Sequence, residues 1–226
     1  MIEADFIGFK SELFDFLCEL TFNNNKAWFD LNRDRYKELF KEPMDLLAQK
    51  LIKEVNNFNS DIDFIYSVSR INRDVRFSKN KEPYRNSKWI TIKTNSGTCK
   101  HLPVLFFELM PSGYTYGMGI YCTKPDLMAA YRKRIDSNIN EISRLIQTYK
   151  GQKKFLLEGD MYKRKLSEYD GDIAQWYQLK DFALICNKEI NESIFDGSVV
   201  DEVIEGFKAL MPFFKYWYEI SQTVNQ

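Results

Sequence analysis

The sequence predicts an α+β fold, read as a single domain over residues 1–226 with a largely antiparallel central sheet. Apolar residues recur at helical spacing near both ends of the chain, whereas β-branched and aromatic residues gather in the middle beside a turn signal. No stretch rich in Gly, Ser or Pro divides the chain, and its 226 residues suffice for one well-cored domain. Helices, then clustered strands, then helices is the order typical of α+β proteins.

Three helices are expected in about the first sixty residues. The first carries apolar residues three and four positions apart, namely Phe6, Phe9, Leu13, Leu17 and Leu20. Asn24 or Asn25 is placed to cap the second, because asparagine accepts hydrogen bonds from the first free amides of a helix. Pro43 fits the first turn of the third.

The middle of the chain reads as strands. Phe64 to Phe77 is the first, and Trp89 to Ile92 the second. Val104 to Leu109 and Tyr114 to Tyr121 flank Pro111-Ser112-Gly113, which predicts a hairpin.

Helices and short strands alternate in the last third. Thr123 and Pro125 resemble a helix start, and a further helix is expected from Ile139 to Tyr149. Short strands are expected around 155–157 and 182–185, followed by a final helix with a kink or break before Pro212.

Composition narrows the class of protein. Its 32 basic residues balance 32 acidic ones, no apolar run reaches the length of a membrane span, and the first residues do not resemble a secretory signal. We therefore expect a soluble cytoplasmic protein with no membrane partner. The four cysteines are scattered and His101 is the only histidine, so we expect reduced thiols and no metal site. No cofactor is indicated.

Basic residues concentrate between Arg70 and Lys93, where eight stand beside two acids. Strand alternation places Arg70, Asn72, Asp74 and Arg76 on one face and turns Ile71, Val75 and Phe77 towards the core at the far end. Arginines that converge in this way suit a phosphate or a carboxylate, which their guanidinium groups bind in a two-pronged geometry.

The candidate ligand-binding residues follow from this arrangement. Arginines would grip the anion, Asp74 would orient them, a loop lysine would close over the ligand, and Tyr84 would donate its hydroxyl. Arg73 has the opposite parity and joins only if the strand bulges or ends before it. The full set is Arg70, Arg73, Asp74, Arg76, Ser78, Lys79, Lys81, Tyr84 and Arg85.

The string RDVRFSKNKEPYR resembles the RDxRFSxxKxPYK signature of the domain-of-unknown-function 2461 family. Asn23-Asn24-Asn25-Lys26-Ala27-Trp28-Phe29 is similar to its NNxxWF segment, and Gly117-Met118-Gly119-Ile120 to its glycine-containing strand. The resemblance carries over the signature positions Arg73, Asp74, Arg76, Phe77, Ser78, Lys81, Pro83 and Tyr84. Asn86-Ser87 stands where many members have Thr-His, which puts a histidine role there in doubt. The family has no established activity, so the resemblance implies none.

Three interpretations of the basic segment stay open. In the first, the segment forms structural ion pairs within a protein-interaction module, and the acidic residues between Glu189 and Glu205 are available as partners. Alternatively it binds an anionic small molecule, with or without a reaction. Nucleic-acid binding is the lesser alternative, because the chain has no net positive charge. Oligomeric state is not readable from the sequence.

Overall fold

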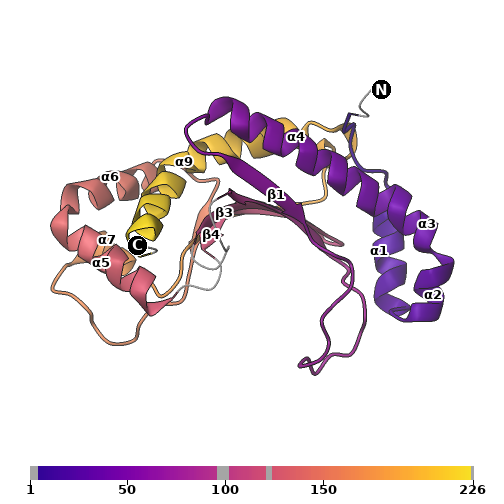
Figure 1. Cartoon of the computed structure of the whole chain (residues 1–226), viewed down its shortest axis with the longest axis horizontal. Coiled ribbons are helices and arrows are strands. Elements are labelled where there is room, and N and C mark those ends of the chain that lie inside the picture. The colour runs from indigo at the N-terminus through magenta and orange to yellow at the C-terminus, as the bar shows by residue number, and fades with distance from the viewer. Residues whose placement is uncertain (1–4, 96–101, 121–123, 225–226) are drawn as a thin grey trace. The chain divides into compact units, whose positions relative to one another are not determined.

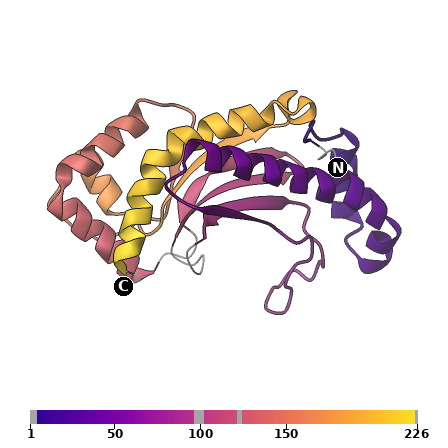
Figure 2. The ribbon, with the colours of Figure 1, turned by 45° about the horizontal axis from the view of Figure 1, so that its top comes forward.

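The computed structural model describes residues 5–95, 102–120 and 124–224, in which six strands form one antiparallel sheet (Figures 1 and 2). The strand order is β1-β2-β3-β4-β6-β5. The strands are β1 (Phe64–Val68), β2 (Lys88–Thr94), β3 (Pro103–Met110), β4 (Gly113–Ile120), β5 (Leu156–Glu158) and β6 (Ala183–Glu189). The predicted α+β class with an antiparallel sheet is confirmed, as is the hairpin whose strands, β3 and β4, flank Pro111 and Ser112.

The chain folds into two compact units. Unit 1 comprises Met1–Ile92, Phe106–Tyr116 and Asn187–Glu205, and unit 2 comprises Lys93–Leu105, Gly117–Cys186 and Gly206–Gln226. Strands β2, β3, β4 and β6 each contribute residues to both units. The interpretation of residues 1–226 as one domain stays a prediction.

Unit 1 contains several helices. They are α1 (Glu12–Phe22), α2 (Lys26–Leu31), α3 (Arg33–Tyr36), a π-helical turn η1 (Lys37–Lys41), α4 (Glu42–Phe58) and the short α8 (Ser193–Asp196). The α4 helix packs along β1 through a buried stripe that includes Leu47, Leu51 and Val55. Asn25 caps α2 as predicted, since its side chain accepts a hydrogen bond from the Trp28 amide at 3.0 Å.

The first helix starts later than predicted. Phe6 and Phe9 are buried, but they precede α1, which begins at Glu12. Gly8 has a φ of 113°, which a right-handed helix excludes, and the carbonyl oxygen of Phe195 approaches so closely that a Cβ on Gly8 would lie 2.0 Å from it. Spacing alone did not show this break, because both phenylalanines still reach the core.

The prediction that the first strand continues to Phe77 was wrong. β1 ends at Val68, and Phe77 is 95% exposed. Beyond the strand, the Asn72–Tyr84 bridge closes the base of a loop, where the Arg73 amide donates to the Pro83 carbonyl at 2.8 Å. The alternating pattern continues past the point where the backbone leaves its partner strand, so alternation misplaces the strand end.

Unit 2 contains α5 (Pro125–Ser137), α6 (Ile139–Lys150), α7 (Gly171–Tyr177) and most of α9 (Val199–Val224). Tyr131 stacks on Trp217 with ring centroids 4.4 Å apart in its core. The α9 helix continues through Pro212, so of the kink or break predicted there the break is absent; buried side chains on both sides of the proline, Leu210 and Phe214 among them, hold the helix in place. The seven-residue α7 was not predicted. Cys99, His101, Cys122 and Thr123 lie outside the described residues.

Candidate functional site

A pocket of about 420 Å³ lies in unit 1, between the helices that follow α2 and the chain that leaves β1. Its wall combines cations with aromatic rings. The basic members are Arg33, Lys37, Lys41, Arg70 and Lys88, the one carboxylate is Asp45, and the aromatic members are Phe29, Tyr36 and Tyr84. Five cations facing one carboxylate make the pocket suited to an anion.

One side of the pocket is a basic stripe. Arg33, Lys37 and Lys41 follow one another at intervals of four residues, the spacing that places side chains on one helix face. The stripe runs through the π-helical turn η1, a type of turn that occurs often at functional sites. Each cation has a carboxylate partner: Arg33 pairs with Asp30, Lys37 with Asp34 at 2.9 Å, and Lys41 with Asp45 at 2.7 Å.

Lys88 provides the opposite wall from the start of β2. Residues on this strand alternate between buried and half-buried, which turns Lys88 to the same side as Ile90 and Ile92 and leaves it 3% exposed. Its ammonium has three donors, and the described part of the chain provides one acceptor, the Ser69 carbonyl oxygen. No carboxylate of the described residues forms an ion pair with it.

Burial lowers the pKa of Lys88; the Asp45 carboxylate opposes this effect and the Lys41 ammonium adds to it. A buried ammonium without a paired carboxylate is costly, because removing it from water costs several kcal/mol. A bound anion would offset this desolvation cost, which is larger for Lys88 than for the exposed cations of the pocket.

Arg70 is a second cation without a carboxylate partner. It follows β1 by two residues, is exposed, and makes no ion pair with the described residues. A guanidinium group presents five N–H donors in a planar fork that matches phosphate and carboxylate.

Aromatic rings close the pocket. Tyr84 stacks on Phe29 with centroids 4.0 Å apart and planes 18° apart. Asn24 holds the Tyr84 backbone in place, since its amide donates to the Tyr84 carbonyl at 2.9 Å and its oxygen accepts from the Tyr84 amide at 3.0 Å. Burial, with the Asp45 charge adding to it, raises the pKa of Tyr36 to about 12, so this phenol keeps its proton.

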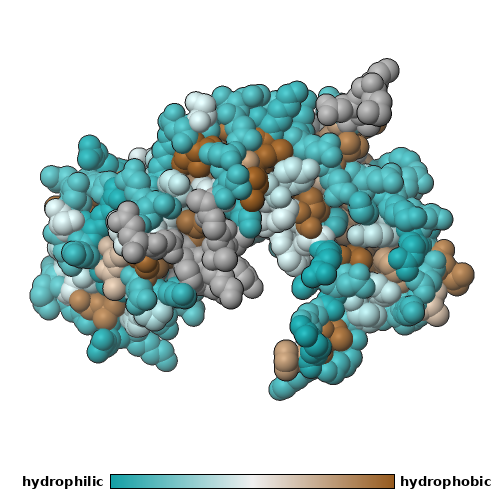
Figure 3. Space-filling view, viewed as in Figure 1, coloured by the Kyte–Doolittle hydropathy of each residue, from teal (hydrophilic) through white to brown (hydrophobic). Residues whose placement is uncertain are grey.

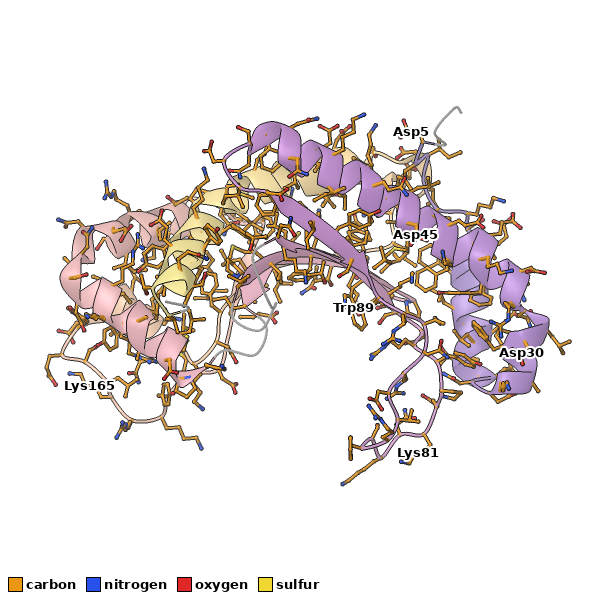
Figure 4. All side chains as sticks on the ribbon, in the orientation of Figure 1. Asp5, Asp30, Asp45, Lys81, Trp89 and Lys165 are labelled. Atoms are coloured by element: carbon orange, nitrogen blue, oxygen red, sulfur yellow. The ribbon has the colours of Figure 1, made fainter. Side chains whose placement is uncertain are left out.

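The loop 73–83 carries most of the other predicted site residues away from the pocket. Figure 4 shows Lys81 near the far end of this loop, while Asp45 lies on α4 and Trp89 on β2. Arg76 donates to both carboxylate oxygens of Asp74, at 2.9 and 2.6 Å, and both side chains are exposed. The Asp74–Arg76 pair lowers the pKa of Asp74 and raises that of Arg76 through these hydrogen bonds.

Other contacts of the loop are also local. The Lys81 ammonium donates to the Val75 carbonyl at 3.0 Å, and Arg73 lies 3.4 Å from a Glu82 carboxylate oxygen. Ser78 donates its backbone amide to the same Val75 carbonyl at 3.4 Å, and Lys79 is exposed. Hydrophilic side chains cover most of the loop, interrupted by apolar ones (Figure 3).

A smaller hollow of about 160 Å³ lies at the base of the loop. Arg73, Glu82, Tyr84 and Arg85 line it together with Asn24 and its neighbours. The Arg85 guanidinium lies over the Trp89 ring, 4.8 Å from its centroid, and Glu82 partly neutralises Arg73. This hollow therefore has less unpaired positive charge than the larger pocket.

The structure thus separates the predicted residues. Arg70 and Tyr84 line the large pocket, Arg73 and Arg85 line the small hollow with Tyr84, and Asp74, Arg76, Ser78, Lys79 and Lys81 lie on the loop. Two pocket features were missed although both leave a sequence signal. The Arg33–Lys37–Lys41 spacing indicates one helix face, and alternation from Ile92 through Ile90 points Lys88 inward.

The described residues contain no cluster of three or more His, Cys, Asp or Glu that could hold a metal ion. Of the described cysteines, Cys18 is exposed and Cys186 is buried, both as free thiols. None of the described helices combines the length and the apolar content needed to cross a bilayer.

Fold and pocket together define an α+β protein with a cationic, aromatic-walled pocket. The chain belongs to the family described as "Conserved hypothetical protein (DUF2461)", whose model matches residues 12–216. A comparison with curated proteins finds no match. The matched range includes every residue that lines the pocket.

Proposed function

We propose that unit 1 binds a small molecule bearing a phosphate or carboxylate group in the pocket between Arg70 and Lys88. The observation that carries this proposal is the buried Lys88 ammonium, which has one backbone acceptor and no carboxylate partner within the described residues. Arg70 adds a second cation without a carboxylate partner at the same wall.

The basic stripe strengthens the field that such an anion would meet. Its three cations are at least half exposed and carry carboxylate partners, so each contributes less than a desolvated charge. Phe29 and Tyr84 supply an apolar wall, which suits a ligand with a ring or a short carbon skeleton beside its anionic group. The loop residues Arg73 and Arg76 fit the structural ion-pair alternative better, because each is paired within the loop.

Thermal denaturation in increasing inorganic phosphate, pyrophosphate and citrate tests this proposal. Binding to the folded state raises the unfolding temperature with ligand concentration. A lost charge-assisted hydrogen bond is worth about 1.5–3 kcal/mol, so Arg70→Ala is expected to weaken binding by roughly ten- to a hundredfold. Arg76→Ala is the matched control, since it removes an arginine from the same segment but outside the pocket, and its affinity should equal that of the wild type.

Two results would contradict the proposal. One is an anion response that Arg70→Ala leaves unchanged. The other is a response lost in Arg76→Ala but kept in Arg70→Ala, which would move the site to the loop.

A further inference from the structure

Among the lysines of the pocket wall, Lys88 differs in its surroundings from Lys37 and Lys41. Lys37 and Lys41 are about half exposed, and each forms an ion pair with a carboxylate, at 2.9 and 2.7 Å. Lys88 is 3% exposed and has a backbone carbonyl as its acceptor in the described residues. Burial favours the neutral amine of Lys88, the form that has a lone pair for attack on carbon; the Asp45 carboxylate opposes this effect and the Lys41 ammonium adds to it.

We propose that the Lys88 amine forms a Schiff base with a small aldehyde or ketone that carries a phosphate or carboxylate group. This inference rests on the proposed function, because the anionic group would be held by Arg70 and the basic stripe while the carbonyl carbon faces Lys88.

The reaction requires no oxidant or cofactor. The nitrogen lone pair of neutral Lys88 bonds to the carbonyl carbon, and the carbonyl π electrons move to oxygen, which takes up the proton released by nitrogen. The carbinolamine hydroxyl then takes up a proton from solvent and leaves as water, while the nitrogen lone pair forms the C=N bond of a protonated imine. Loss of the nitrogen proton returns one proton to solvent, so that amine and carbonyl compound give an imine and one water.

The remaining wall fits these steps. Tyr36 lines the same pocket and stays protonated at neutral pH, so it is a hydrogen-bond donor for the carbonyl oxygen. Within the described residues, the Tyr36 hydroxyl makes no hydrogen bond. The burial that lowers the pKa of Lys88 also increases the fraction of nucleophilic amine near neutral pH.

The test uses the full chain with pyridoxal 5′-phosphate, which combines an aldehyde with a phosphate, and with glyoxylate, which combines an aldehyde with a carboxylate. Borohydride reduction converts each imine into a stable amine, and peptide mass spectrometry identifies the modified lysine. We expect Lys88 to be labelled faster than Lys37 or Lys41, because those two ammonium groups are held in ion pairs with carboxylates whereas Lys88 is buried without one among the described residues. Inorganic phosphate should compete and slow the labelling.

Variants separate failure of this inference from failure of the proposed function. Lys88→Arg keeps the positive charge and removes the primary amine, so it should still bind phosphate while losing the adduct. Arg70→Ala keeps Lys88, and we expect it to slow labelling about tenfold by weakening the anion site. Lys79→Arg changes an exposed lysine of the loop, outside the pocket; it is the matched control and should be labelled at Lys88 at the wild-type rate.

Phosphate binding without preferential labelling of Lys88 would overturn the Schiff-base inference and leave the proposed function intact. If neither phosphate nor the Arg70→Ala substitution slows the labelling of Lys88, the link to an anionic substrate is overturned. If no anion binds the wild type, both proposals fail together, and the thermal-denaturation series shows this independently of any labelling.

Discussion

Two basic centres, one in each unit, show how differently the same kind of charge is used. In unit 2, Arg134 donates to Glu141 at 2.9 and 2.5 Å and to Glu219 at 2.6 Å, and it lies over the Tyr216 ring at 4.8 Å. In unit 1, Lys88 has one backbone acceptor and Arg70 makes no ion pair with the described residues. The first centre is engaged by two carboxylates of the fold, whereas the cations of the second have no carboxylate partner among the described residues.

The difference teaches that a count of basic residues does not locate a site. The carboxylate partners of Arg134 raise its pKa, and they already occupy its Nε and Nη2 donors, which a ligand would otherwise use. What distinguishes a binding cation is the number of acceptors that the fold itself supplies.

The largest expected effect is on stability in unit 2. Arg134→Ala removes the cation that joins Glu141 and Glu219 and should lower the free energy of unfolding by about 2 kcal/mol. Urea denaturation at neutral pH measures this loss, and phosphate binding should not change. A variant as stable as the wild type would show that the ion pairs of Arg134 do not stabilise the fold.

The same substitution has a pH signature. Arg134 holds the pKa of Glu141 below its ordinary value, so the stabilisation is present above pH 4.5 and is lost as the pH falls through the lowered, folded-state pKa. The difference between wild type and Arg134→Ala should therefore shrink in acid. A difference that grows as the pH falls would contradict the assignment.

A smaller effect of opposite sign is expected at Lys88. Lys88→Met replaces a buried, incompletely paired cation with an apolar side chain of similar length, and should raise the free energy of unfolding by about 1 kcal/mol at neutral pH while weakening phosphate binding. Because the folded-state pKa of Lys88 is lowered, the wild type gains stability as the pH rises through that pKa towards 10.5, and the difference narrows there. Urea denaturation across a series of alkaline pH values tests this. A destabilised variant would make Lys88 a structural residue like Arg134.

The smallest effect is expected on the loop. Arg76→Ala breaks the fully exposed pair with Asp74, and screening by solvent makes such pairs weak. The urea midpoint should match that of the wild type within error. A clear loss of stability would mean that the loop arginine is held by more than its neighbour.

Several sequence predictions succeeded because they depended on local chemistry. Asn25 caps α2 through its own side chain, and the β3–β4 hairpin flanks a turn that Pro111 and Ser112 favour. Others failed where a distant segment intervened. The backbone of Phe195 approaches Gly8, and the chain leaves the sheet after Val68 although alternation continues to Phe77.

Part of the pocket could be predicted from the sequence. Arg70 and Tyr84 were among the predicted residues, and the stripe from Arg33 to Lys41 and the inward position of Lys88 follow from helix and strand periods. What periods do not show is that α3, η1 and the start of β2 face one another, because that depends on how α4 packs along β1.

By itself the sequence determined the fold class, the family and the segment in which basic residues concentrate, since composition, period and motif are properties of the chain alone. Tertiary structure decided which of those cations meet a carboxylate. Coulomb attraction and desolvation act over a few ångströms through space, so the fate of each charge depends on neighbours that lie far away along the chain, as Glu219 lies 85 residues from Arg134.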